Sequence, residues 1–304
     1  MSTSVLFDAP GPRAKIRNGI LTVVSVVAVA AVLYGIYAGF DAKNQWDSRI
    51  WQPFLQAETW EIWIIPGLIG TLRAAAVAAV LALLFGAVFG LARLSDHKWI
   101  RVPAGVVVEV FRAIPLLLLI FFIFYLAPTL FGGGDYAFIS VVLGLMLYNG
   151  SVLAEVVRAG VLAVPKGQSE AAYAIGMRKN QVMRLVLLPQ AVTAMMPAIV
   201  SQLVVLLKDT ALGYIIAYVD LLNTGFKILP SALFGSLIPA AIVIGVIYVG
   251  LNMALSALAT WLERRSRRSR KTAAPPVVPP AAGMLGGGPA PAAPGAAEAV
   301  STME

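Results

Sequence analysis

The sequence predicts an all-α protein that crosses a membrane about six times and keeps both termini in the cytoplasm. Hydrophobic residues occupy 59% of the 304 positions and charged residues only 12%, about half the charged fraction of a soluble domain. Apolar stretches of about 20 residues, enough to cross a bilayer as a helix, recur along the chain. The sequence contains no cysteine, which excludes disulfides and cysteine-based metal sites.

Six stretches have the length and composition of membrane spans. We predict them at Gly19–Phe40, Pro66–Leu91, Val102–Leu126, Phe138–Leu162, Val186–Leu207 and Leu233–Trp261. The last is long enough to cross the bilayer with tilt.

The first stretch could instead be a cleaved signal peptide, because basic residues precede it and Ala28-Val29-Ala30 resembles a cleavage site. The apolar run continues unbroken to Phe40, which is longer than a signal core needs. We therefore expect residues 19–40 to be retained as an extra N-terminal transmembrane helix, preceded by a cytoplasmic segment at residues 1–18.

The distribution of lysine and arginine determines the predicted orientation. With the N-terminus inside, most of the 23 basic residues fall in cytoplasmic segments, including the cluster Arg264–Lys271. We therefore attribute the net charge of +8 to membrane orientation and anionic lipid, and expect no nucleic-acid partner. The few basic residues left outside lie near acidic ones; these external basic residues are Lys43, Arg49, Lys208 and Lys227.

Two segments lie outside the predicted bundle. Residues 41–65 are external and rich in tryptophan, which fits either a helix at the membrane interface or a loop with anchoring aromatic residues. Residues 266–304 comprise a basic flank and a tail. From Thr272 to Glu304 the tail is dominated by proline, alanine and glycine, so we expect it to be disordered.

The longest polar segment between apolar stretches is Gly167–Pro189, which by composition alone is a surface helix. Its spacing, Glu170-Ala171-Ala172 followed by Gly176, resembles the EAA signature of ABC importer permeases, with Val186 in place of the usual isoleucine. The resemblance implies that residues 163–185 are a cytoplasmic coupling loop with a helix from about Lys166 to Met177. The residues that would touch an ATPase subunit are Glu170, Ala171, Ala172 and Gly176.

The resemblance extends from Gly67 to Arg265 and is closest to the polar amino-acid uptake branch of these permeases. Four blocks occur in the expected order: Gly70-Thr71-Leu72, Glu109-Val110-Phe111-Arg112 with Pro115, Ala154-Glu155 with Arg158, and Leu207-Lys208-Asp209-Thr210. Ala113-Ile114 departs from the common Gly-Thr. The resemblance implies a type I permease core at residues 66–265, and the whole chain is most similar to the glutamate permease subunits of high-GC Gram-positive bacteria.

The same resemblance implies the partners and the location. They are two copies of an ABC ATPase that carries ATP and Mg²⁺, a second permease that is identical or related, and an extracellular solute-binding protein. The transported solute would be a polar amino acid, with glutamate as the first choice, and the site of action the cell membrane.

No chemistry of its own is expected of this chain. The phosphate-binding pattern G-x-x-x-x-G-K-[ST] is absent, so we expect ATP hydrolysis on a separate polypeptide. No catalytic triad, paired carboxylates or metal-ligand cluster appears in the sequence, and the single histidine, His97, lies in a short polar turn. We therefore predict no catalytic residues, no metal and no bound cofactor.

Charged residues inside predicted spans are costly and point to partners or cavities. Glu109 and Arg112 are three residues apart, as are Glu155 and Arg158, so each pair can meet on one helix face. We favour structural ion pairs near the cytoplasmic boundary over direct contact with a solute.

Polar residues of the fifth span fall within a sector of about 80° on a helix. Such a stripe fits a translocation path, and it fits hydrogen bonding between helices equally well. The stripe consists of Gln190, Thr193, Pro197, Ser201 and Lys208.

Arg73 lies about seven residues into the second span without an acidic residue at i±3 or i±4. It must extend its charge toward the interface, find a carboxylate on another helix, or line a watery cavity. The sharper hypothesis is that Arg73 faces the translocation path and binds the carboxylate of an acidic amino acid through its two-pronged guanidinium.

Two other classes of protein remain as alternatives. An ion-coupled secondary transporter would show internal repeats and interrupted helices at mid-membrane. A membrane scaffold that recruits a cytoplasmic partner would use the same polar loop. The sequence shows no convincing repeat, and a secondary transporter would leave the EAA loop unexplained.

Overall fold

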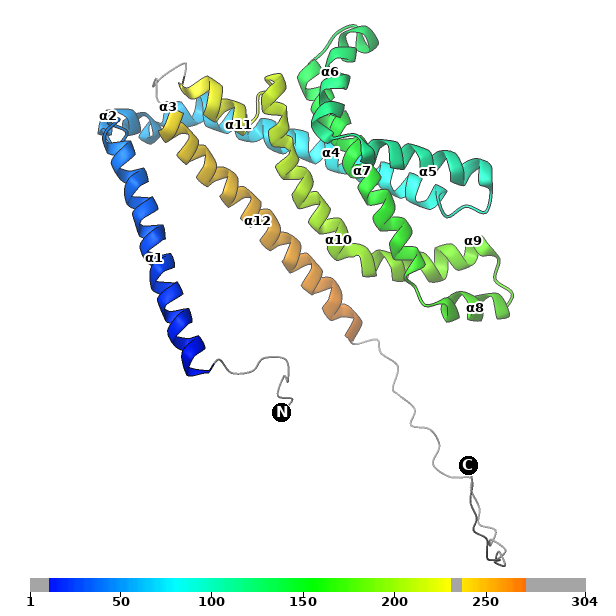
Figure 1. Ribbon diagram of the computed structural model, residues 1–304. Helices are drawn as coiled ribbons and strands as arrows, with labels where there is room; N and C mark the ends of the chain where they lie inside the picture. The colour runs from blue at the N-terminus through cyan, green and yellow to red at the C-terminus, as the bar shows by residue number, and fades with distance from the viewer. Residues whose placement is uncertain (1–10, 231–236, 272–304) are drawn as a thin grey trace, which may run out of the picture. The chain divides into compact units, whose positions relative to one another are not determined.

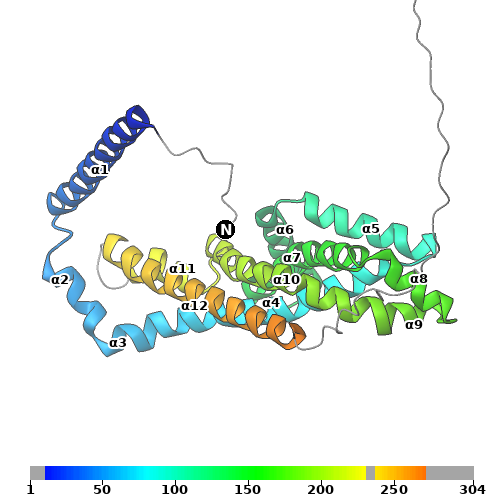
Figure 2. The ribbon, with the colours of Figure 1, turned by 90° about the horizontal axis from the view of Figure 1, so that it is seen from below.

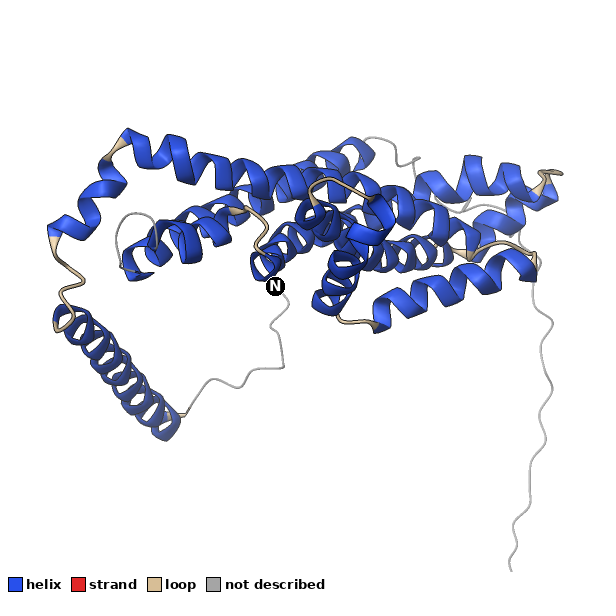
Figure 3. Ribbon diagram, turned by 90° about the horizontal axis from the view of Figure 1, so that it is seen from above, coloured by secondary structure: helices blue, strands red, loops and turns tan. Residues whose placement is uncertain are grey.

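The computed structural model describes residues 11–230 and 237–271, and every regular element in these ranges is helical (Figures 1 and 3). The long helices are α1 (Pro12–Asp41), α4 (Ile65–Ala92), α5 (Lys98–Ala113), α6 (Leu116–Phe131), α7 (Tyr136–Leu162), α10 (Leu188–Asp209) and α12 (Leu237–Lys271). Five helical stretches are long and apolar enough to cross a membrane, or six if α5 and α6 form one span. The predicted all-α transmembrane fold is therefore confirmed, while the orientation of the termini stays a prediction.

Short helical turns connect the long helices. Between α1 and α4 lie α2 (Ser48–Trp51), η1 (Gln52–Leu55), α3 (Ala57–Thr59) and η2 (Trp60–Ile64). The predicted coupling loop contains α8 (Lys166–Ala174), α9 (Lys179–Gln181) and η3 (Val182–Leu187). After α10 follow η4 (Thr210–Ile216), α11 (Leu221–Asn223) and η5 (Thr224–Ile228).

The third predicted span, Val102–Leu126, is not one continuous helix. α5 and α6 meet at an angle of 101° (Figure 1). Pro115 lacks a backbone N–H and disfavours helical geometry at the preceding residue. Ile114 accordingly has extended backbone angles, with φ −80° and ψ 126°. The expectation of a continuous span was wrong at this proline.

The centre of the fold is the pair α4 and α7, which approach closely because small residues line their contact. A Cβ atom added at Gly86 would lie 2.6 Å from the Cβ of Leu153, and one at Gly90 would lie 2.7 Å from the Cβ of Val157. Figure 2 shows α7 between α5 and α10, which both contact it. The helices α5, α6 and α10 thus pack on α7, whereas α8 packs on η3.

Polar contacts connect the remaining helices to this centre. Gln202 of α10 donates a hydrogen bond from Nε2 to Oδ1 of Asn149 on α7, at 2.6 Å. The hydroxyl of Tyr248 on α12 donates to the carbonyl oxygen of Lys208 at 2.8 Å. The first bond is half-buried and joins α10 to α7, and the second is exposed and joins α12 to α10.

The tryptophan-rich segment forms helical turns, not a plain loop. The indole N–H of Trp51 donates to the carbonyl oxygen of Gln45 at 2.8 Å, and that of Trp60 donates to the carbonyl oxygen of Phe54 at 2.8 Å. Trp46 and Trp51 stack with ring centroids 6.4 Å apart. By contrast, no residue of α1 is buried.

The predicted C-terminal parts are only partly described. α12 begins at Leu237 and continues to Lys271, so the predicted start of the last span at Leu233 and the predicted disordered tail from Thr272 lie outside the described residues.

Candidate functional site

The predicted coupling helix is present as α8, which ends at Ala174 rather than at Met177. Glu170 and Ala171 are exposed, whereas Ala172 is 5% exposed and packs inside this chain. The exposed face therefore offers a carboxylate and a methyl group to a partner. Ala172 instead holds α8 against its own subunit, which differs from the expectation that it would allow close approach of an ATPase.

Gly176 ends α8 through its backbone conformation. Its φ is +81°, a left-handed value that favours glycine. The Gly176 N–H donates to the carbonyl oxygen of Tyr173 at 2.9 Å, and the Met177 N–H donates to that of Ala172 at 3.1 Å. These two bonds form a Schellman motif. A Cβ atom at Gly176 would meet nothing within 4 Å in this chain, so the glycine is needed here for the turn.

Two side-chain contacts attach the coupling segment to the membrane helices. Gln190 of α10 donates from Nε2 to Oε1 of Gln168 on α8 at 3.3 Å. Lys179 of α9 forms an ion pair with Asp96, in the turn between α4 and α5. The hydrogen bond from Lys179 lowers the pKa of the Asp96 carboxyl below its ordinary value. A cavity of about 300 Å³ beside this ion pair is lined by His97 and Arg184, among others.

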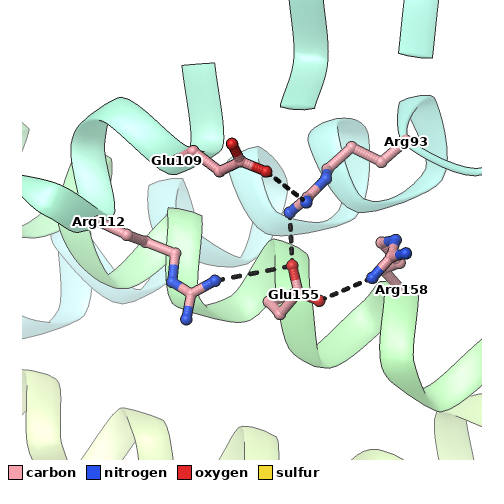
Figure 4. A network of polar contacts seen from close by, with 5 residues as sticks. All are labelled: Arg93, Glu109, Arg112, Glu155 and Arg158. Atoms are coloured by element: carbon pink, nitrogen blue, oxygen red, sulfur yellow. Dashed lines mark hydrogen bonds and ion pairs between the residues drawn. The ribbon is translucent and has the colours of Figure 1, made fainter. Parts of the chain in front are cut away.

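The four residues predicted as ion pairs belong to one network, which has Glu155 at its centre and also includes Arg93 (Figure 4). Arg93 lies 2.5 Å from Glu155 and 3.4 Å from Glu109, and its side chain is only 11% exposed. Glu155 also accepts from Arg158 at 2.9 Å and lies 3.7 Å from Arg112.

The network differs from the predicted pairs in one respect. Glu155 and Arg158 pair along α7 as expected. Among the described residues no ion pair joins Glu109 to Arg112; Glu109 pairs with Arg93 and Arg112 with Glu155 instead. Sequence spacing could not reveal Arg93, since it is 62 residues away from Glu155. The network joins α4, α5 and α7.

The polar stripe of α10 does not face a single cavity. Gln190 contacts α8, and the Thr193 hydroxyl donates to the carbonyl oxygen of Pro189 within its own helix at 3.1 Å. Ser201 and Lys208 are exposed. At the other end of the helix, Lys208 lines a cavity of about 590 Å³ together with Tyr248 and Asn252 of α12. These positions remain candidates for the translocation path.

Arg73 lines a different pocket, of about 380 Å³. The Arg73 side chain finds an aromatic partner, not a carboxylate: its guanidinium lies over the ring of Phe138, 4.2 Å from the centroid. The pocket also includes Asp135, Tyr218 and Val219, which the sequence did not single out.

One wall of this pocket is the segment after η4, which is held against α4 by hydrogen bonds between side chains and backbone. The Tyr218 hydroxyl donates to the carbonyl oxygen of Gly70 at 2.8 Å, and the Leu221 N–H donates to the Thr71 hydroxyl at 3.0 Å. A Cβ atom at Gly70 would clash with the carbonyl oxygen of Val219. The Gly70-Thr71 block is therefore needed to bring these two segments together. Burial raises the pKa of Tyr218 to about 12.

Comparison with known proteins places this geometry in a family. Residues 82–268 match the family described as binding-protein-dependent transport system inner membrane component. The chain is 42% identical over 230 residues to the glutamate transport system permease protein GluD of Corynebacterium glutamicum, covering 75% of this chain and 84% of that protein. It is 30% identical to the glutamate/aspartate import permease protein GltK of Escherichia coli, covering 67% of this chain and 93% of that protein.

A solved structure supports the same family assignment. The chain superimposes on a chain of an amino acid ABC transporter crystallised with histidines, with a TM-score of 0.63 and 32% identity, covering 70% of this chain and 98% of the other. Family match, relatives and structural likeness all favour an ABC importer permease over the two alternative classes, the secondary transporter and the scaffold. The chain is a multi-pass protein of the plasma membrane, and it belongs to the family of inner-membrane components of binding-protein-dependent transport systems.

Proposed function

We propose that this chain is the permease subunit of an ATP-driven importer whose solute is glutamate. The observation that carries the proposal is α8, a short helix with an exposed Glu170, ended by Gly176 and attached to the membrane helices. The choice of solute is supported by the relatives, two of which carry glutamate in their names.

The importer would contain parts that lie on other chains. Two ATPase subunits would bind ATP and Mg²⁺ and dock on α8 through Glu170, Ala171 and the turn at Gly176. A second permease, identical or related, would complete the translocation path, and an extracellular solute-binding protein would deliver the amino acid. This chain would supply the path and the mechanical coupling, without bond chemistry.

The contacts around α8 support such coupling. A displacement of α8 would reach α10 through Gln190 and Gln168, and it would reach the turn between α4 and α5 through Lys179 and Asp96. The Arg93 network would then pass the motion to α5 and α7 as one unit. The path candidates Arg73, Gln190, Thr193, Ser201 and Lys208 lie on the helices moved in this way.

Reconstitution tests the proposal. The chain, its partner permease and the ATPase are placed in liposomes with internal ATP, and binding protein with radiolabelled glutamate is added outside. We expect uptake that requires ATP and stops when the phosphate-binding lysine of the ATPase is replaced by alanine. Uptake that continues with the inactive ATPase and follows an ion gradient would refute the proposal.

A further inference from the structure

The pocket beside Arg73 has two charged groups on its walls. Arg73 extends from α4, and Asp135 precedes α7 at the turn that follows α6. Both side chains line one pocket of about 380 Å³, yet no ion pair within 4 Å joins them in the described part of the chain. The pocket therefore presents one cation and one anion that are not paired with each other.

Both charged groups are oriented by the same residue, Phe138. Its ring supports the Arg73 guanidinium from one face at 4.2 Å. Because the N–H donors of a guanidinium lie in its plane, this stacking leaves them available at the edge. The Phe138 backbone N–H donates to Oδ1 of Asp135 at 3.0 Å, which fixes that carboxylate as the N-cap of α7.

The other polar group of the pocket, the Tyr218 hydroxyl, already has a hydrogen-bond partner in the chain. The Tyr218 hydroxyl donates to the carbonyl oxygen of Gly70, so its ring forms a wall and its donor is occupied. The remaining lining residues are apolar or glycine, such as Ile69, Ala137 and Val219. A ligand would therefore meet one oriented cation, one oriented anion and an apolar surface.

We propose that this pocket binds a free α-amino acid as a zwitterion. The Asp135 carboxylate accepts hydrogen bonds from the α-ammonium group, and the Arg73 guanidinium donates to a carboxylate of the same molecule. The proposal rests on the proposed function as an amino-acid permease and adds Asp135 as the group that requires a free ammonium. A dicarboxylate that lacks the ammonium group would bring only negative charge near the Asp135 carboxylate, which would repel it.

The test is direct binding to the purified complete transporter in the absence of the binding protein, so that only sites on the transporter are measured. Radiolabelled glutamate is displaced by unlabelled glutamate or by N-acetylglutamate, which lacks the free ammonium. Asp135→Asn removes the charge and keeps the helix cap, because asparagine caps as well as aspartate. Asp47→Asn is the matched control, since Asp47 is also an exposed N-cap that accepts one backbone N–H, from Arg49 at 2.9 Å.

We expect the parent to bind glutamate and discriminate against N-acetylglutamate. Asp135→Asn should weaken glutamate binding by roughly tenfold or more, the loss typical of a charge-assisted hydrogen bond, and should abolish the discrimination. Asp47→Asn should behave as the parent. A merely structural role of Asp135 would not change the preference for the free ammonium.

Several results would overturn the inference. Asp135→Asn with parental affinity and parental discrimination would show that the ammonium binds elsewhere. A parent that imports glutamate with its binding protein but binds none without it would refute this pocket and leave the proposed function intact. A parent that imports no amino acid at all would refute the proposed function itself.

Discussion

Two arginines of the α4 region differ in their surroundings: Arg73, about two turns into the helix, and Arg93, directly after its last residue. Arg93 has a side chain that is 11% exposed, within 3.4 Å of carboxylates on α5 and α7. Arg73 is exposed and stacks on the Phe138 ring, and among the described residues it forms no ion pair. The same side chain joins helices at one end of α4 and remains free to meet a ligand at the other.

The difference follows from how each end is packed. Near Arg73, the segment after η4 is held to α4 by hydrogen bonds to the Gly70 carbonyl oxygen and the Thr71 hydroxyl, without an ion pair. At the Arg93 end, α5 and α7 reach α4 with acidic side chains, and only a guanidinium satisfies both at once. We therefore expect Arg93 to act in structure, where it joins three helices, and Arg73 to act in function, where hydrogen bonds already join the segments.

Arg93→Met should have the largest effect. It removes the cation that lies between Glu109 on α5 and Glu155 on α7, so α4 loses its ion pairs to both helices, while Glu155 keeps Arg112 and Arg158. We expect a lower melting temperature of the purified protein and poor assembly with the ATPase. Arg101→Met, at an exposed arginine of α5, is the control and should melt like the parent. If the Arg93→Met protein were as stable as the parent, the ion-pair network would not stabilise the contacts between α4, α5 and α7.

Arg73→Ala should leave stability unchanged and reduce glutamate uptake by roughly tenfold or more, because a charge-assisted contact to the solute is lost. Arg73→Lys should recover only part of the uptake, since lysine lacks the two-pronged geometry. Initial uptake rates in liposomes, at matched protein content, measure the effect. If the alanine variant transports like the parent, Arg73 only anchors its helix, and the two ends of α4 do not differ in function.

Gly176→Ala extends the comparison to α8. An L-residue in left-handed geometry costs roughly 1–2 kcal/mol, so α8 should end less sharply and ATP hydrolysis should respond less to loaded binding protein. Gly176→Trp should abolish uptake while the protein still inserts in the membrane. Gly167→Ala, inside α8 where alanine is favoured, is the control. A Gly176→Trp variant that transports normally and co-purifies with the ATPase would contradict the docking of α8.

Asp220→Asn should have the smallest effect, visible as a change in pH dependence. Burial raises the pKa of Asp220 to about 7. Because the folded state then binds a proton that the unfolded state has released, stability should fall as pH rises from about 4 to about 7. Asparagine keeps the N-cap to Asn223 and should flatten this decline, shifting the melting temperature near pH 8 upward by a few degrees. Parallel melting curves for parent and variant across this pH range would exclude the effect.

Much of the fold follows from the sequence because a membrane helix must satisfy its own backbone hydrogen bonds. The apolar stretch Phe138–Leu162 predicts α7, observed at Tyr136–Leu162, and the Pro115 position marks a break once proline chemistry is considered. The EAA spacing likewise predicts α8 and the importance of Gly176. These features are local, since helix length, caps and turns depend on residues within a few positions of one another.

Only the tertiary structure decided which side chains meet. Arg93 and Glu155 are 62 residues apart, and their contact depends on the rotation of α4 against α7, set by close approach at Gly86 and Gly90. Arg73 and Asp135 share a pocket because Phe138 orients both. The sequence determined the helices, the membrane location and the coupling segment through local patterns. The partners of each charge came from packing between distant segments, because Coulomb and hydrogen-bond contacts act across space, independent of separation along the chain.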